Sequence, residues 1–357
     1  MTRSITHDPS LRSPGRGAAS NERGRYEAFV RSYEPAPAGA DALRTKVSVE
    51  RPRSLITYNR SPDLPFDRSI NPYRGCEHGC IYCFARPSHA WLGLSAGLDF
   101  ETRLVARAEA PQVLEQELRS PRYRVAPIAI GTNTDPYQPI ERTHEITRAC
   151  LRVLLRFNHP VAIVTKGTLI ERDIDILSDM AERGLVRVGL SLTTMDAELS
   201  RRMEPRAPSP GRRLRTIERL SAAGIPVRVM TSPVVPGLTD HEIESLLEAA
   251  RGAGASAASW IMLRLPLEVS RLFQDWLAEN YPDRAARVMG LVRGMHDGQD
   301  YASDWGHRMR GSGHHAEMIA QRFDLAARKS GLDRAQPKLR CDLFKPPPKL
   351  GDQLSLF

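Results

Sequence analysis

Three of the five cysteines stand within eight residues, in the sequence Cys76-Glu-His-Gly-Cys80-Ile-Tyr-Cys83. Spacings of three and then two residues allow one loop to place three thiolates around one face of a [4Fe–4S] cluster. Because such clusters normally take four thiolates, one iron is left to chelate a substrate or cofactor, unless Cys150 or Cys341 reaches it. We call Cys76, Cys80 and Cys83 the cysteine triad. Its spacing predicts an iron–sulfur centre with one open iron.

Two other uses of the triad are weaker. A structural zinc site of three cysteines and one histidine would need His78 or His89 as the fourth ligand. Zinc modules usually carry two cysteine pairs, and the chain has no second pair. A disulfide framework is also a poor interpretation, because the number of cysteines is odd and the chain has 357 residues. The chain also starts with a polar segment that is unlike a secretory signal.

The residues around the triad alternate between short apolar runs and amphipathic stretches. The predicted strands are 69–74, 128–131, 161–165, 186–192, 227–230 and 259–265. The predicted helices are 141–157, 171–183, 212–223 and 240–252, and Gly184 and Gly224 follow two of them as expected C-caps. This alternation favours parallel βα units, and six of them make a partial (β/α)6 TIM-like barrel with its site at the carboxyl ends of the strands. A doubly wound sheet is the alternative, but no dinucleotide-binding glycine pattern follows the first strand.

Charge and composition divide the chain into four parts. Residues 1–60 hold 11 Lys and Arg against 6 Asp and Glu and are predicted to form a basic, mostly disordered arm. The barrel is expected over 61–266 and a helical extension over 267–331. Residues 332–357 form a proline-rich tail, and 328–357 hold 7 basic against 3 acidic residues. Basic ends favour polyanions, although solubilising tails explain them equally well. No apolar run is long enough for a membrane span, so we expect a cytoplasmic protein.

The triad, with the aromatic Tyr82 before its last cysteine, resembles the radical S-adenosylmethionine (SAM) superfamily over about residues 65–266. The resemblance implies a radical SAM enzyme with a [4Fe–4S] cluster bound by the triad. It also implies that the open iron chelates the amino and carboxylate groups of SAM. An electron from the cluster would then cleave the sulfonium of SAM and give a 5′-deoxyadenosyl radical. Such an enzyme needs a reductant such as flavodoxin or ferredoxin.

Within that superfamily the chain resembles the spore photoproduct lyase-like branch, often named DNA repair photolyase. Three segments carry the likeness: 131–139 (GTNTDPYQP), 164–167 (VTKG) and 189–194 (GLSLTT). By position, the resemblance implies these cofactor contacts: Tyr82, Thr132, Asn133, Lys166, Ser191 and Thr193. A zwitterionic cofactor needs a cation, which Lys166 supplies, and hydroxyl or amide partners. The alternative is that Lys166 is a solvated loop charge and that the hydroxyls only satisfy the backbone.

One position departs from the branch. In spore photoproduct lyase a cysteine near the end of the second strand returns hydrogen to the product radical, and Thr132 stands there in this chain. A hydroxyl O–H bond is too strong to replace a thiol, so lyase activity on thymine photoproduct is not expected. Cys150 is predicted in a helix core, and Cys341 in the tail is a weak candidate to fold over the barrel mouth.

Other segments suggest contacts with substrate. Six arginines after the fourth strand either grip phosphate or form a solvated loop: Arg201, Arg202, Arg206, Arg212, Arg213 and Arg215. Residues 303–315 are expected to form a mobile substrate loop.

The last five residues, Gln353-Leu-Ser-Leu-Phe357, resemble the peptide with which bacterial proteins dock on the replicative sliding clamp. Gln353 offers polar contacts, while Leu354, Leu356 and Phe357 are apolar anchors. The combined prediction is a radical SAM enzyme acting on nucleic acid, in DNA repair or modification, at the sliding clamp. The alternatives are a radical SAM enzyme on a small molecule or protein, and a non-catalytic iron–sulfur protein that binds nucleic acid or the clamp.

Overall fold

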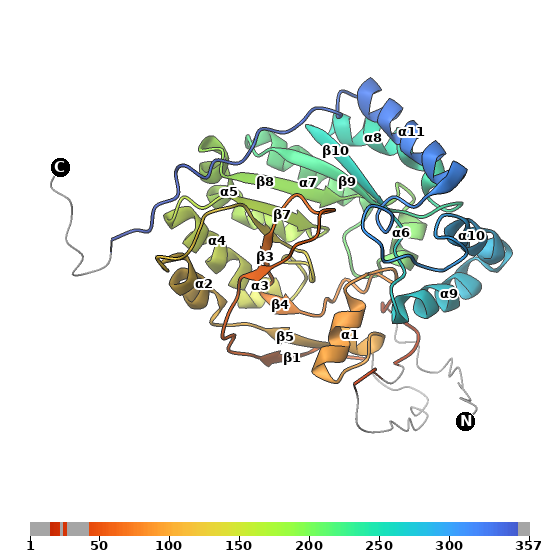
Figure 1. Cartoon of the computed structure of the whole chain (residues 1–357), viewed down its shortest axis with the longest axis horizontal. Coiled ribbons are helices and arrows are strands. Elements are labelled where there is room, and N and C mark those ends of the chain that lie inside the picture. The colour runs from red at the N-terminus through yellow and green to blue at the C-terminus, as the bar shows by residue number, and fades with distance from the viewer. Residues whose placement is uncertain (1–14, 22–23, 27–42, 349–357) are drawn as a thin grey trace.

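A computed structural model describes residues 15–21, 24–26 and 43–348 (Figure 1). Its main sheet has seven strands in the order β10-β9-β8-β7-β6-β3-β2. Their bounds are β2 Thr57–Tyr58, β3 Arg68–Ile70, β6 Ile128–Ile130, β7 Val161–Thr165, β8 Val186–Ser191, β9 Val227–Val234 and β10 Ala257–Met262. The six strands from β3 to β10 pair in parallel, and β2 is antiparallel to β3. This is the predicted partial barrel, with β2 and β10 at its two edges.

A second sheet of three strands, which we did not predict, lies beneath the main one (Figure 1). Its order is β1-β5-β4, with bounds Lys46–Val49, Arg103–Ala106 and Tyr73–Arg74. The last of these strands leads directly into the triad. The small sheet therefore holds the start of the cysteine loop.

Five helices pack on the outside of the main sheet: α2 Ala110–Leu118, α4 Ile146–Arg156, α5 Ile174–Glu182, α7 Pro210–Ala222 and α8 Ile243–Gly252. Their apolar faces and the sheet form the main core, in which most side chains are fully buried. The helix predicted over 141–157 is divided into α3 (Glu141–His144) and α4, because Glu145 adopts φ 50°. Gly184 and Gly224 adopt positive φ at the expected helix ends.

The remaining helices lie between the strands and in the extension. The short ones are η2 Arg86–Leu92, α1 Leu98–Thr102, η3 Thr168–Asp173, α6 Ala197–Met203 and η4 Asp240–Glu242. The extension after β10 consists of α9 Glu268–Asn280, α10 Pro282–Gly294 and α11 Gly313–Lys329. Of these, α11 packs beside α8 and joins it through an ion pair between Arg322 and Glu244. None of the helices in the described ranges is both long and apolar enough to cross a membrane.

Part of the region predicted as a disordered arm is ordered against the barrel. The amides of Gly17 and Ala18 each donate to the buried carboxylate of Glu101, at 2.9 Å. The carbonyl of Ser20 accepts from the amide of Leu98 at 3.1 Å. We call residues 15–21 the N-terminal strap. The prediction of an arm over 1–60 thus overlooked this strap, β1 and β2, because their composition resembles that of a linker.

The described part of the tail runs along the amino ends of the strands. The amide of Arg340 donates to the carbonyl of Gly184, before β8, and the amide of Lys345 to that of Phe157, before β7, both at 3.0 Å. The ring of Phe344 stacks on Phe157 at 6.3 Å between centroids. Residues 353–357, which carry the clamp-binding motif, lie outside the described residues.

Candidate active site

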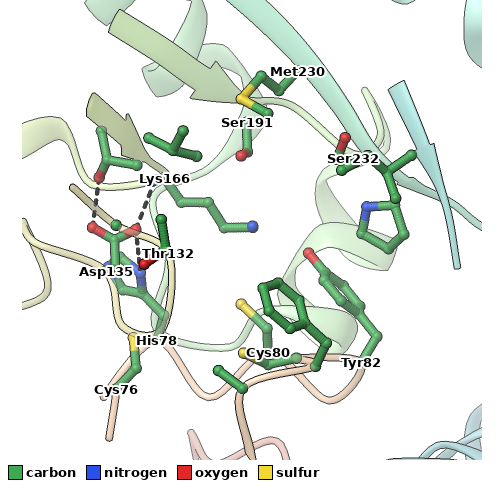
Figure 2. A pocket seen from close by; sticks show the side chains of 18 of the residues that line it. Cys76, His78, Cys80, Tyr82, Thr132, Asp135, Lys166, Ser191, Met230 and Ser232 are labelled. Carbon is green, nitrogen blue, oxygen red and sulfur yellow. Dashed lines mark hydrogen bonds and ion pairs between the residues drawn. The ribbon is translucent and has the colours of Figure 1, made fainter. Parts of the chain in front are cut away.

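A cavity of about 180 Å³, partly open to solvent, lies at the carboxyl ends of the parallel strands. The triad lines one side of it, and residues at or just after β6, β7 and β8 line the other (Figure 2). Of the residues predicted to contact a cofactor, the following line this cavity: Tyr82, Thr132, Asn133, Lys166 and Ser191. Strands far apart in sequence therefore bring the predicted residues to one place.

A buried arginine holds the cysteine loop in shape. Arg86 is 0% exposed, and its guanidinium donates to the carbonyls of Gly79 and Cys80 at 3.0 and 2.9 Å. It also pairs with Glu101 at 2.5 Å. The loop carbonyls and a carboxylate together satisfy a charge that would otherwise be costly to bury. The conformation of the triad loop is thus set by residues outside the triad.

The loop after β6 fixes the other side of the triad. Thr134 donates through its hydroxyl to the carbonyl of Gly75 at 2.6 Å. The side-chain amide of Gln138 donates to the same carbonyl at 3.1 Å and accepts from the amide of Glu77 at 2.9 Å. Cys76 lies between these two backbone contacts, so the second parallel strand positions the first cysteine.

The histidines considered as zinc ligands have other partners. His78 lies 3.3 Å from the carboxylate of Asp135, and Nε2 of His89 donates to the carbonyl of Arg103 at 2.9 Å. No three Cys, His, Asp or Glu side chains of the described residues converge on a point that would hold a metal ion. The arrangement suits three thiolates spaced around a larger cluster better than a closed zinc site.

Lys166 brings a half-buried cation into the cavity. Its ammonium extends toward the centre of the cavity, 5.7 Å from the centroid of the Tyr82 ring (Figure 2). Burial alone disfavours the charged form, but the nearby Cys80 and Glu204 outweigh burial and raise the pKa of Lys166. Lys166 makes no ion pair with the other described residues. The solvated-loop alternative therefore does not describe its surroundings, and its charge is available to an anionic group.

The polar groups on the remaining walls have different surroundings. Ser191 is 4% exposed at the end of β8 and faces the cavity. Thr132 exchanges hydrogen bonds of 3.2 and 3.4 Å with the side-chain amide of Asn71. The amide of Asn133 donates to the same side chain at 3.0 Å, and its own side chain donates to Ser88 at 3.2 Å.

Thr193 does not line the cavity. Its hydroxyl donates to Glu204 at 3.0 Å and lies 3.3 Å from the hydroxyl of Tyr82. Tyr82 donates to the same carboxylate. Thr193 therefore contacts a residue of the cavity wall rather than the cavity itself. It lies two residues beyond the end of β8, where the loop and not the strand sets the direction of the side chain.

Glu204 and Arg213 form a buried ion pair behind Tyr82 that sequence reasoning missed. Both residues are 1% exposed. Burial alone would raise the pKa of Glu204, but Arg213 and Lys166 lower it to about 2. Arg213 also donates to the carbonyl of Ser191 at 3.1 Å. This pair connects two walls of the cavity, and its only sequence signal was the arginine-rich segment around it.

Asp135, also missed, connects the loops after β6 and β7. Its carboxylate accepts from the hydroxyl of Thr165 at 2.5 Å and from the amide of Lys166 at 2.7 Å. Burial opposes its charge, but His78 and these donors hold the pKa of Asp135 well below its usual range. The aspartate thereby fixes the backbone that carries Lys166.

The other candidates from the sequence lie away from the cavity or have partners. Cys150 is fully buried in the main core, as predicted. Cys341 belongs to the tail segment at the amino ends of the strands, so it does not cover the barrel mouth. Four of the six arginines form ion pairs: Arg202 with Glu198, Arg206 with Glu77, Arg212 with Glu171, and Arg213 with Glu204. Arg202 and Arg206 are nevertheless exposed, as the solvated interpretation expects, whereas Arg212 is half-buried and Arg213 is buried.

The segment predicted as a mobile loop joins the two edges of the barrel. The amide of Met262 at the end of β10 donates to the carbonyl of Met309 at 2.9 Å. Near the other edge, the carboxylate of Asp63 accepts from the amide of Gly306 at 2.7 Å and from Arg308 at 2.6 Å. We call residues 301–310 the bridging segment.

The fold and site together define a partial-barrel enzyme with a cysteine-triad loop at the carboxyl ends of its strands. The chain belongs to the radical SAM superfamily, whose family model matches residues 70–250. It is a radical SAM enzyme, and the family implies a [4Fe–4S] cluster and SAM. The triad and the half-buried ammonium of Lys166, which forms no ion pair within the described ranges, fit these two groups.

An uncharacterized protein of Mycobacterium tuberculosis is 39% identical over 232 residues, which are 64% of this chain and 68% of that protein. An uncharacterized protein of Methanocaldococcus jannaschii is 26% identical over 215 residues, 60% of this chain and 76% of that one.

Among solved structures, spore photoproduct lyase complexed with dinucleoside spore photoproduct has a TM-score of 0.58 at 13% identity, covering 79% of both chains. A mutant form of the lyase has a TM-score of 0.51 at 15% identity and covers 66% of both chains. At this identity the likeness concerns the fold.

Proposed function

We propose that this radical SAM enzyme acts on nucleic acid, in DNA repair or modification. The observation that carries the proposal is the single cavity in which the cysteine triad faces the ammonium of Lys166. The nucleic-acid substrate is supported by the fold shared with spore photoproduct lyase, one structure of which holds a dinucleoside lesion. The excess of basic residues at both ends of the chain also favours a polyanionic partner.

In this proposal the triad holds the cluster, and Lys166 binds the carboxylate of SAM. Thr132 and Asn133 contact its amino group, while Ser191 and Tyr82 bind its other parts. When bound there, the cofactor would supply the radical chemistry, which the side chains of the protein cannot supply themselves. The protein orients the cofactor and keeps water out, and Asp135 and Glu204 hold the backbone and side chains that do so. Thr193 acts through Tyr82 and Glu204.

The proposed reaction differs from that of a lyase that depends on a protein thiol. This chain resembles spore photoproduct lyase around residue 132. Thr132 occupies the position at which the lyase has its hydrogen-donating cysteine. Of the described residues that line the cavity, the thiol-bearing ones are those of the triad. We therefore propose that hydrogen is returned to the product, if at all, by a donor other than a cysteine of the cavity wall.

We also propose that residues 353–357 dock on the bacterial sliding clamp. The support is the sequence of the motif and its position after a proline-rich segment, where an apolar peptide is accessible to a groove. Docking would place the enzyme at sites of DNA synthesis.

The test is the formation of 5′-deoxyadenosine by reconstituted, dithionite-reduced protein, with and without damaged DNA. Stimulation by damaged DNA supports the proposal. Formation that is insensitive to DNA favours a small-molecule or protein substrate. No formation, with an intact cluster, favours a non-catalytic iron–sulfur protein that binds nucleic acid or the clamp.

A further inference from the structure

Arg264 follows β10 and lines the cavity. Lys166 follows β7, so the two cations come from different strands of the sheet. Its guanidinium lies between two aromatic rings, 4.8 Å from the centroid of Phe84 and 5.8 Å from that of Tyr301. It donates from Nη2 to the hydroxyl of Tyr301 at 3.1 Å. The two rings hold the guanidinium plane, which reduces the entropy lost when it binds a ligand.

Most of the hydrogen-bonding capacity of Arg264 is unused. Its Nε is buried without a partner in the described part of the chain, and Nη2 is the nitrogen that makes its hydrogen bond. A buried donor without a partner is costly, so an acceptor entering the cavity would be bound favourably.

The carboxylate of Asp63 is close enough to interact with the charge of Arg264. Asp63 is nevertheless bound by Gly306 and Arg308 of the bridging segment. Arg264 therefore forms no ion pair with the described carboxylates, and its positive charge faces the cavity.

Phe84 adds a stacking surface beside this charge. It follows the last cysteine of the triad, lines the same cavity and is 47% exposed. A large exposed ring next to an unpaired guanidinium suits a ligand that combines a planar group with an anion. In a nucleic acid these are the base and the phosphodiester.

We propose that Arg264 binds a phosphodiester of the substrate and that Phe84 stacks on an adjacent base. This inference rests on the proposed action on nucleic acid and makes Arg264 a substrate-binding rather than a cofactor-binding residue. Tyr301 is a positioning residue, held by the bridging segment on which it lies. The pocket then has two cations with separate tasks, Lys166 for the cofactor and Arg264 for the substrate.

The test compares two dinucleotides, thymidylyl-thymidine and its neutral methylphosphonate analogue, by titration against the full-length, cluster-loaded protein. The variants are Arg264→Gln, Arg264→Lys and Phe84→Ala. The control Arg287→Gln removes the same charge from an exposed position on α10, outside the cavity. SAM affinity, iron content and melting temperature are measured for each variant.

We expect Arg264→Gln to weaken binding of the charged dinucleotide by roughly ten- to a hundredfold, the usual effect of losing a charge-assisted contact. Binding of the neutral analogue should change much less, and SAM affinity should be unchanged. Arg264→Lys should recover part of the loss, Phe84→Ala should weaken both dinucleotides, and Arg287→Gln should weaken neither.

Four results would overturn the inference. Equal losses for the charged and neutral dinucleotides would remove the phosphodiester contact, and a loss confined to SAM would reassign Arg264 to the cofactor. If the Arg264→Gln variant binds the charged dinucleotide as tightly as the wild type, the role of Arg264 is refuted but the proposed function is not. A wild-type protein that binds neither dinucleotide counts against the proposed function as well.

Discussion

Glu204 is predicted to contribute more to stability than any ordinary surface carboxylate, although it contacts no substrate. It is the buried counter-charge of Arg213 and lies close enough to Lys166 to interact with it. Glu204→Gln keeps the shape and one hydrogen-bond acceptor but removes the negative charge. Arg213 would then remain buried without its ion-pair partner, and Lys166 would lose a nearby negative charge.

The magnitude follows from the pKa of Glu204, which the folded protein lowers from 4.5 to about 2. At about 1.4 kcal/mol for each tenfold change in the protonation equilibrium, the charged form gains about 3 kcal/mol. Breaking a buried pair by removing one partner costs a similar amount, about 3–5 kcal/mol. Because the folded pKa is depressed, this contribution is complete above the unfolded value near 4.5 and is lost as the pH falls toward 2.

The assay is urea unfolding of the wild type and Glu204→Gln at pH 7 and again near pH 3. We expect a difference of about 3 kcal/mol at pH 7 that narrows at the lower pH. The control is Glu198→Gln, because the Glu198 side chain is 71% exposed in its pair with Arg202 and should cost less than about 1 kcal/mol. Equal effects of the two substitutions, or a difference that does not narrow in acid, would refute the reasoning.

Three further predictions concern the cluster, the cofactor and the tail. Replacing any triad cysteine with serine should abolish the roughly four irons bound per reconstituted chain, whereas Cys150→Ser should retain them; one zinc without labile sulfide would contradict this. Lys166→Ala should weaken SAM binding by roughly ten- to over a hundredfold with iron content intact, and an unchanged affinity would remove Lys166 from the site. A chain ending at Asp352 should lose sliding-clamp binding in a pull-down, and equal retention by both forms would disprove the docking motif.

Five of the six parallel strands, β6 to β10, were predictable because each is a short apolar run that overlaps an observed strand. The sixth prediction, one extended segment over 69–74, overlaps β3 but is divided in the structure between β3 and β4, which belong to different sheets. The triad was predictable because its ligands are close in sequence. The small sheet was not, because β1 is mostly exposed and β4 has only two residues. Such strands form because a neighbouring strand pairs with them, and their own sequences show no pattern of alternating apolar residues.

The predictions for the site failed where the role of a side chain depends on which other side chains the fold places beside it. Arg213 appeared as one of six surface arginines, and only the fold shows that Glu204 neutralises it beneath Tyr82. Thr193 was assigned from a strand end, but it lies two residues past the last residue of β8, where the loop decides whether a hydroxyl faces the cavity. Residues 303–315 seemed mobile because they are rich in glycine and histidine, whereas Gly306, Arg308 and Met309 in the middle of the segment bind the two barrel edges.

The N-terminal strap meets the barrel backbone to backbone. A Cβ on Gly17 would lie 1.9 Å from the carbonyl oxygen of Gly79, inside the cysteine loop, and a Cβ on Gly97 would lie 2.1 Å from that of Ser20. Neither position has room for even a methyl group. The usual profile of mutational tolerance is therefore reversed here: a stretch that looks like a permissive linker contains a position less replaceable than many in the core.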